Sequence, residues 1–155
     1  MTVSGVARVD FYQLTRDPVE RVLPAIAARI LGNGDRLLVV AASAMQRQQI
    51  DEALWTLQPA SFLPHGNAGS PDEQIEPILL SGTLHPAPPN GASHVALADG
   101  EWRADALGFD RAFLLFGNDR IDDARAAWRS LAKADGAERH FWRQDDRGRW
   151  SEIAS

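Results

Sequence analysis

The stretch Phe113–Gly136, FLLFGNDRIDDARAAWRSLAKADG, has the pattern of an apolar strand, a Gly-Asn-Asp turn and an amphipathic helix. An α-helix has about 3.6 residues per turn, so apolar side chains three and four positions apart lie on one side of it. Five residues follow this spacing and predict one buried stripe: Ile121, Ala124, Ala127, Trp128 and Leu131. The stretch therefore predicts a strand–turn–helix unit whose helix packs against a core.

Two arginines lie beside the apolar stripe of this helix. Arg125 and Arg129 are one turn apart, and Trp128 is three residues after Arg125. An aromatic ring and two guanidinium groups at these positions can share one surface patch, which suits an anionic, partly apolar ligand. Solvated arginines beside a core tryptophan would give the same pattern, so the helix alone leaves both interpretations open.

A first strand and helix are predicted near the N-terminus. Residues 6–13 alternate and are rich in branched and aromatic side chains, which predicts a strand. The segment 17–20, Asp-Pro-Val-Glu, has the pattern of a helix start with Asp17 as the N-cap. Pro24 allows either a helix that bends there or an irregular turn before a helix over residues 24–31, and Gly32-Asn33-Gly34 ends the helix in both cases.

The next segments continue the alternation of strands and helices. Residues 36–42 form a continuous apolar run, typical of a strand buried on both faces, and Ser43 with Gln46 predicts a capping box before a helix over residues 44–57. Further strands are predicted at 77–81, 94–98 and 112–116, an extended piece at 59–65, a loop at 66–76, an irregular connection at 85–92 and an edge strand at 139–144. We therefore predict an α/β fold, a single domain over residues 1–155 with an open sheet of five or six mostly parallel strands flanked by about three helices.

The distribution of charge bears on the kind of partner. The 155 residues carry a net charge of -5; residues 1–118 hold 8 basic and 13 acidic residues, whereas residues 119–155 hold 8 of each. A protein that holds DNA through phosphate contacts normally presents a net basic face. We therefore expect contact with nucleic acid only indirectly, although the C-terminal arginines can form a local anion site.

Sequence motifs for catalysis and cofactor binding are absent. The chain has no cysteine, no G-x-G-x-x-G, G-x-x-x-x-G-K-[ST] or G-x-S-x-G motif, and no histidine spacing typical of a metal site. We therefore predict a Rossmann-like sheet without a nucleotide-binding loop, with no catalytic residue, cofactor or metal. The N-terminal residues lack the pattern of a signal peptide and no apolar window approaches the length of a membrane span, so we expect a cytoplasmic protein with no membrane contact.

Two aromatic residues lie where an exposed surface is expected. Trp55 is close to the end of the second predicted helix, and Phe62 follows in the proline-bounded piece before Pro64 and His65. These side chains can belong to the core, or they can form an apolar patch of the kind that binds a partner protein.

Several short motifs, taken in order along the chain, resemble one known family. They are DFY at 10–12, DEALW at 51–55, SFLPH at 61–65, ARxxWR at 124–129 and FWRQDxxGRW at 141–150. In these motifs the chain is similar to the chi subunit of the bacterial DNA polymerase III holoenzyme. The resemblance spans nearly the whole chain, and the combination of DEALW with SFxPH is its most specific part.

The resemblance implies an α/β adaptor without enzymatic activity of its own. Such a subunit pairs with the psi subunit, which links it to the clamp loader, and binds the acidic C-terminal tail of single-stranded-DNA-binding protein, which ties the polymerase to coated template. By this resemblance the psi-contacting patch corresponds to Trp55 and Phe62. The tail-binding site corresponds to Arg125, Trp128 and Arg129, with Leu114 nearby on the preceding strand.

Two positions depart from the family pattern. Some family members carry a lysine one turn before the key arginine, where this chain has Ile121 beside Arg120, and the aromatic residue of the tail site is often tyrosine where this chain has Trp128. Because Ile121 carries no positive charge where some members have a lysine, the affinity for the acidic tail depends on the remaining arginines.

Two other functions remain open from the residues alone. A small-molecule enzyme would be favoured by a deep pocket lined by histidines and carboxylates at the carboxyl ends of the strands. A direct binder of single-stranded DNA would use aromatic rings beside arginines near the C-terminus, where an edge hairpin is the structural interpretation. The residues concerned are Trp142, Arg143, Arg147, Arg149 and Trp150.

Overall fold

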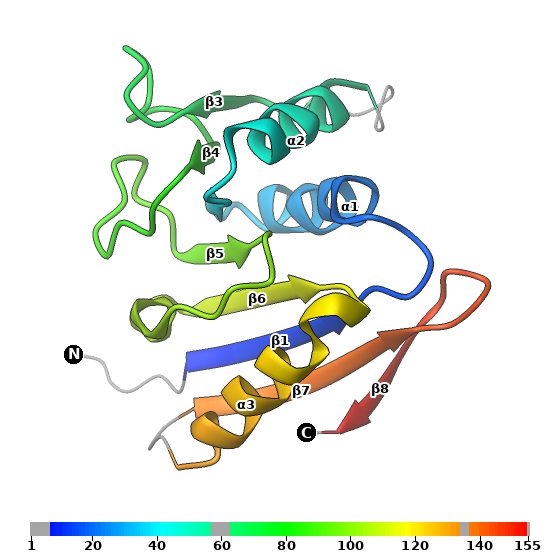
Figure 1. Ribbon diagram of the computed structural model, residues 1–155. Helices are drawn as coiled ribbons and strands as arrows, with labels where there is room; N and C mark the ends of the chain where they lie inside the picture. Colours follow the sequence, from blue (N-terminus) through cyan, green and yellow to red (C-terminus); the bar gives the residue numbers. More distant parts are fainter. Residues whose placement is uncertain (1–6, 57–62, 134–136, 155) are drawn as a thin grey trace.

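The structure, a computed structural model, describes residues 7–56, 63–133 and 137–154. Strands and helices alternate through most of this chain, as the sequence predicts (Figure 1). In chain order the elements are β1 (Ala7–Gln13), α1 (Val19–Gly32), β2 (Leu37–Val40), α2 (Ala44–Thr56), β3 (His65–Asn67), β4 (Ile78–Ser81), β5 (His94–Leu97), the 3-10 helix η1 (Ala104–Gly108), β6 (Arg111–Phe116), the 3-10 turn η2 (Asn118–Arg120), α3 (Ile121–Leu131), β7 (Ala137–Gln144) and β8 (Trp150–Ala154).

The strands form one sheet in the order β3-β4-β2-β5-β6-β1-β7-β8. Every neighbouring pair is parallel except β7 and β8, which form an antiparallel hairpin. The α/β fold with a mostly parallel sheet is confirmed, but the predicted number of strands was too low, since the described residues form a sheet of eight. β7 is also not an edge strand: it lies between β1 and β8, and β8 forms the edge.

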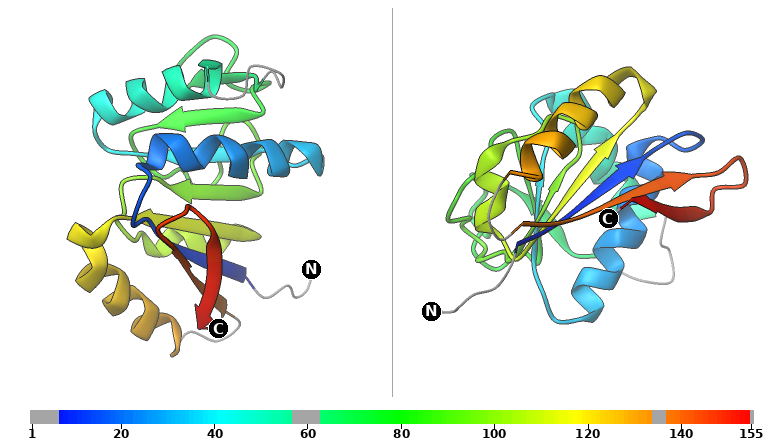
Figure 2. Two further views of the ribbon diagram at one scale, coloured as in Figure 1. Left: turned by 90° about the vertical axis from the view of Figure 1, so that its right-hand side faces the viewer. Right: turned by 90° about the horizontal axis from the view of Figure 1, so that it is seen from below.

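The sheet divides the core into two layers. Successive side chains of a strand point to opposite faces, so Leu37 and Val39 of β2 pack on one side and Leu38 and Val40 on the other. α1 and α2 cover the first face, whereas α3 and η1 cover the second, and Figure 2 shows α1 and α3 on opposite sides of the strands. Because both faces are covered, β2 is apolar at every position.

Helix α1 runs through Pro24 as one element, so the alternative with an irregular turn before residue 24 is wrong. Its N-cap is Pro18 rather than Asp17, and no side chain caps it. At its other end, the backbone N–H of Gly34 donates to the carbonyl of Leu31, and that of Asp35 to the carbonyl of Ile30. Gly34 has φ of 84°, the left-handed conformation that this type of helix end requires, so the predicted glycine stop is confirmed.

Helix α2 begins with half of the predicted capping box. The Ser43 hydroxyl accepts a hydrogen bond of 3.3 Å from the backbone N–H of Gln46. The Gln46 side chain does not reach back to Ser43; its amide donates instead to the carbonyl of Ala98, just after β5. The start of α2 is thereby tied to the carboxyl end of a neighbouring strand.

The carboxyl ends of β1 and β6 form the point where the fold changes direction. The two strands are neighbours, but the helices that follow them, α1 and α3, cover opposite faces of the sheet. Open α/β sheets bind ligands most often in the crevice at such a point. In residues 7–56, 63–133 and 137–154, no helix combines the length and apolar character that crossing a bilayer requires.

Candidate functional site

Trp128 lies on the inner edge of α3, in an aromatic cluster with two strands. Its ring packs edge-on against those of Phe11 on β1 and Phe141 on β7, with centroids 5.3 and 5.5 Å away. Arg139 of β7 stacks on the Trp128 ring, its guanidinium carbon 4.1 Å from the ring centre, and donates a hydrogen bond to the Trp128 carbonyl oxygen. Trp128 is therefore held between the core and an arginine while part of it stays exposed.

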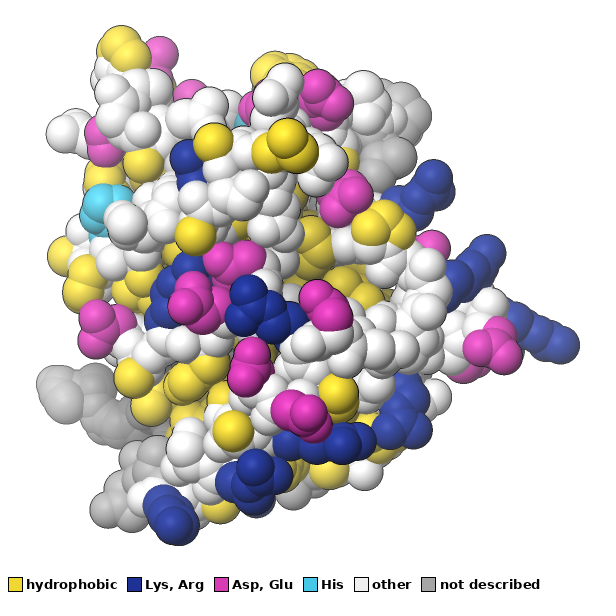
Figure 3. All heavy atoms as spheres, in the orientation of Figure 1, with side chains coloured by type: hydrophobic (Ala, Val, Ile, Leu, Met, Phe, Trp, Pro, Cys, Tyr) yellow, Lys and Arg dark blue, Asp and Glu magenta, His cyan; other side chains and the backbone are white. Residues whose placement is uncertain are grey.

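Arg125 and Arg129 lie on the exposed side of α3. Within the described parts of the chain, neither side chain takes part in a hydrogen bond or an ion pair. Lys133 follows one turn after Arg129 and is also exposed, and Figure 3 shows basic side chains gathered over the region of α3 and β7 at the lower edge of the molecule. Guanidinium groups without a carboxylate partner are available to an anionic ligand.

The helix dipole accounts for one of these arginines better than for the other. Asp122 and Asp123 occupy the first turn of α3 and Arg129 the last, where charges of these signs stabilise a helix. Arg125 lies in the middle of the helix, where the dipole has little effect. Arg125 is therefore the cation that helix stability explains least.

The other residues expected at this site have different positions. Leu114 has no exposed surface and packs in the core beneath α3, so it supports the site from below and does not line it. Ile121 packs against the same core layer. The adjacent Arg120 points to Asp123, 3.6 Å away, and lines the crevice between β1 and β6. It therefore does not replace the missing lysine beside Arg125.

A second surface is formed by the C-terminal end of α2. The Trp55 side chain is 53% exposed, and its ring lies against that of His65, with centroids 4.8 Å apart. His65 is buried between the side chain of Asp51 and the carbonyl of Leu63, which fix its ring. Phe62 lies outside the described residues, so this surface is defined here by Trp55 alone.

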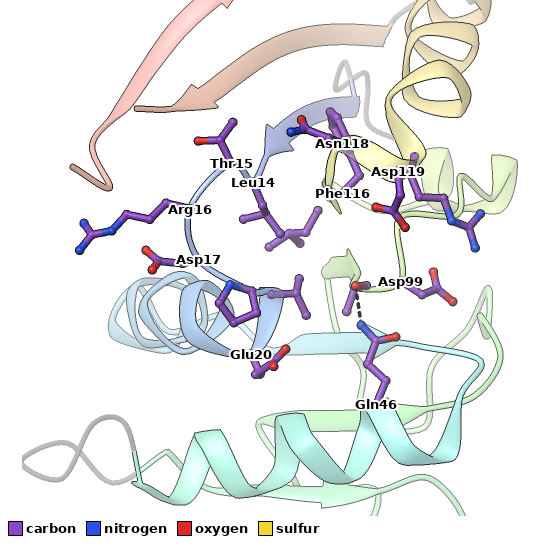
Figure 4. Close-up of a pocket in the computed structure, with 16 residues that line it drawn as sticks. Leu14, Thr15, Arg16, Asp17, Glu20, Gln46, Asp99, Phe116, Asn118 and Asp119 are labelled. Carbon is purple, nitrogen blue, oxygen red and sulfur yellow. Dashed lines mark hydrogen bonds between the residues drawn. The ribbon is translucent and has the colours of Figure 1, made fainter. Parts of the chain in front are cut away.

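The crevice at the carboxyl ends of β1 and β6 contains a cavity of about 550 Å³ (Figure 4). Its lining includes Asp17, Glu20, Asp99 and Asp119, but no histidine among the described residues. Burial raises the pKa of Asp99, but hydrogen bonds from Arg103 and the backbone of Ala42 and Glu101 outweigh it and hold that pKa below its ordinary value.

This cavity lacks the pairing that proton-transfer chemistry needs. Asp17 accepts a hydrogen bond from the Gln144 side chain, and the Thr15 hydroxyl donates to the Gln144 carbonyl. No acid in it is arranged with a described nucleophile or base. The cavity therefore gives no support to the small-molecule enzyme.

The β7–β8 hairpin confirms the structural interpretation of the C-terminal motif. Trp142 donates its indole N–H to Asp10 at 2.9 Å, and both Trp142 and Trp150 pack against Tyr12, with ring centroids 6.3 and 5.0 Å away. These contacts hold both rings against β1, so packing within the protein accounts for them, whereas stacking of a base needs an open aromatic face. Direct binding of single-stranded DNA through this hairpin is therefore not favoured.

His140 joins the two strands of the hairpin and gives a pH-dependent prediction. Its ring contacts Glu138 and Glu152, and the hydrogen bonds to these carboxylates raise the pKa of His140 above 6.5. A raised folded-state pKa stabilises the protein below the unfolded value of 6.5, and this contribution is lost as pH rises through the folded-state pKa. His140→Gln is therefore expected to lower the melting temperature at pH 6 and to have little effect above that pKa. An NMR titration in which His140 of the Glu138→Gln variant kept the wild-type pKa would contradict the proposed cause.

Sequence reasoning missed the contribution of Arg139 to this face. Arg139 was predicted only as a strand residue, although its place two positions before Phe141 puts both side chains on one face of β7. Its stacking on Trp128 depends on β7 lying beside β1, which the sequence does not show.

Comparison with known proteins shows the family to which this chain belongs. A model of the family described as "DNA polymerase III chi subunit, HolC" matches residues 6–139, most of the chain. The chain belongs to this family. The matched range includes α2, α3 and Arg139, the elements that carry both surfaces.

Two curated members of the chi family show the extent of the likeness. The chain is 35% identical over 74 residues to the DNA polymerase III subunit chi of Haemophilus influenzae, an alignment covering 46% of this chain and 51% of the relative. It is 36% identical over 78 residues to that of Escherichia coli K12, covering 46% of this chain and 53% of the relative. The chain thus spans about half the length of the curated relatives it matches.

Proposed function

We propose that this chain is a non-catalytic accessory subunit of the replicative DNA polymerase that binds the acidic C-terminal tail of single-stranded-DNA-binding protein on α3. The observation that carries the proposal is the exposed pair Arg125 and Arg129, without ionic partners in the described chain, beside a fixed Trp128. Arg125, helped by Arg129, pairs with carboxylates of the tail, and the exposed part of Trp128 packs against its final apolar residue.

Arg139 gives this site the rigidity that a short peptide needs. Its stacking and its hydrogen bond to the Trp128 carbonyl fix the ring before a ligand arrives. A ring held in advance loses less side-chain entropy on binding, and the loss of that freedom costs about 0.5–1.5 kcal/mol for a mobile side chain. Arg139 thus acts as a positioning residue, and its positive charge adds to the field of the helix arginines.

Removal of Arg125 tests the tail site. A charge-assisted hydrogen bond contributes about 1.5–3 kcal/mol, so Arg125→Ala is expected to weaken binding of an acidic tail peptide by about tenfold or more in a calorimetric titration. Added salt should weaken wild-type binding. An amidated peptide separates pairing with the terminal carboxylate from pairing with acidic side chains.

Arg21→Ala is the matched control for this titration. Arg21 is an exposed arginine of α1, a helix on the opposite face of the sheet. Its loss changes the net charge equally and should leave the affinity within about twofold, because charges further apart than about 10 Å are largely screened. Equal affinities of wild type and Arg125→Ala would remove Arg125 from the site.

The psi subunit is the proposed partner of the Trp55 surface. A half-exposed tryptophan on a surface helix fits a protein interface, because tryptophan is enriched among the residues that dominate binding energy. Phe62 is proposed to extend this surface. The chain would then link two partners, with Trp55 and the α3 arginines on helices that cover opposite faces of the sheet.

A further inference from the structure

A small, partly enclosed pocket lies between α1 and the strands β1, β5 and β6, on the face of the sheet opposite α3. It has a volume of about 90 Å³, and the polar groups that line it come from Tyr12, Arg29, Asn33, His94 and Arg111. Neither the tail-binding surface nor the Trp55 surface uses any of these residues. Two guanidinium groups and no carboxylate line this space, which is the composition of a site for an anion.

The Tyr12 hydroxyl is the first observation that calls for a ligand. The residue is only 7% exposed, yet within the described chain its hydroxyl makes no hydrogen bond. Every fully buried side-chain nitrogen or oxygen of the described residues has a partner, so this hydroxyl must keep some open surface. A buried tyrosine hydroxyl normally finds a hydrogen-bond partner. A ligand in the pocket can supply this hydrogen-bond partner for the Tyr12 hydroxyl.

The two arginines supply the charge. Arg29 is exposed at the end of α1 and makes no ion pair within the described chain. Arg111 uses its Nε to donate to Asp10 at 2.7 Å and stacks over Phe113, with 4.6 Å between the guanidinium carbon and the ring centre. No hydrogen bond within the described chain uses its two terminal nitrogens. An oxyanion in the pocket can therefore accept hydrogen bonds from both guanidinium groups.

The two nearby carboxylates do not line the pocket, and each lies next to a basic or imidazole side chain. Asp10 is neutralised by Arg8 and Arg111, and Asp35 lies beside His94, with 4.0 Å between carboxylate oxygen and ring Nε2. Burial lowers the pKa of His94, and a hydrogen bond between its Nδ1 and the Ser93 hydroxyl engages one side of the ring. Burial also raises the pKa of Tyr12, which keeps the hydroxyl proton available.

We propose that this pocket binds a small oxyanion of the phosphate class, held by Arg29 and Arg111 with the Tyr12 hydroxyl as a donor. The small volume of the pocket, about 90 Å³, suits a ligand of the size of one phosphate group. Inorganic phosphate and the terminal phosphate of a nucleotide share this chemistry.

The test uses the fact that Tyr12 is the only tyrosine of the chain. A protein labelled with carbon-13 at the tyrosine Cζ gives one ring signal, which reports on the pocket directly. Inorganic phosphate, titrated at pH 7 with ionic strength held constant by chloride, is expected to shift this signal saturably and to raise the melting temperature. Thymidine monophosphate against thymidine shows whether a nucleotide's phosphate is accepted too.

Two variants decide the assignment. Arg29→Gln removes one exposed charge without touching the core and is expected to raise the phosphate Kd about tenfold, whereas Arg21→Gln on the same helix should leave it unchanged. Tyr12→Phe should weaken the effect of phosphate on the melting temperature. A signal that shifts only linearly with phosphate, or an equal Kd in wild type and Arg29→Gln, would overturn the proposal.

Discussion

Replacing Asp10 with asparagine is expected to lower the free energy of unfolding by about 3 kcal/mol at pH 7. Asp10 is completely buried in the middle of β1. Its carboxylate accepts hydrogen bonds from Arg8, from Arg111 at 2.7 Å and from the Trp142 indole at 2.9 Å. The substitution removes the charge that two guanidinium groups share, and places an amide donor where only donors surround it.

The sheet register explains why this carboxylate matters. Arg8 and Arg111 are direct partners across β1 and β6, and like charges opposite one another destabilise a sheet. Asp10, two residues further along β1, lies on the same face and binds both of them. Without it the two cations repel each other, although both keep about a third of their side-chain surface in water, which places the cost at the lower end of the range for buried pairs.

The effect of Asp10→Asn should depend on pH with a definite sign. Burial raises the pKa of Asp10, but the hydrogen bonds from Arg8, Trp142 and Arg111 outweigh it and hold the pKa below 3.8. A lowered folded-state pKa gives a contribution that is complete above the unfolded value and is lost as pH falls through the folded one. The stability difference from wild type should therefore be constant from pH 7 to about 5 and shrink in acid.

Urea unfolding at several pH values measures this difference. Asp72→Asn is the matched control, because Asp72 is exposed in the loop between β3 and β4 and should change stability by less than about 0.5 kcal/mol. A wild-type stability for Asp10→Asn at pH 7 would mean that the network around Asp10 contributes nothing net.

The sequence predicted the fold where the signal is local. The apolar run of β2 and the 3.6-residue stripe of α3 each lie within one segment, so periodicity was enough. β3 was missed because His65–Asn67 is a three-residue strand without an apolar pattern, ordered by pairing with β4. The position of β7 was wrong because its place beside β1 depends on the crossover through α3, which no local pattern encodes.

The candidate sites, too, were predictable from the sequence only where their residues lie in one segment. Arg125, Trp128 and Arg129 share one helix, so their spacing was readable, whereas Leu114 was placed at the site although the structure buries it. Arg139 and the Asp10 network depend on side chains that come together from different strands. Such contacts follow from register, and register is set by the whole sheet.

Trp55→Ala is expected to weaken pairing with the psi subunit by roughly 30-fold or more, while leaving the fold intact. Truncation of a central interface tryptophan costs about 2–4 kcal/mol, and every 1.4 kcal/mol is tenfold in affinity. The ring is 53% exposed and lies against His65, which Asp51 and Leu63 already hold in place. Its removal should therefore leave the supporting surface in position, so that the loss reports on the interface.

Met45→Ala is the control on the same helix. Met45 is 72% exposed at the beginning of α2, whereas Trp55 is near its end. Pairing can be measured by calorimetry with purified psi subunit, alongside the titration with the tail peptide. Trp55→Ala should lose affinity for psi, keep affinity for the tail, and keep its melting temperature. Loss of both affinities with a lowered melting temperature would show a role in the core, and an unchanged affinity for psi would place that interface elsewhere on the chain.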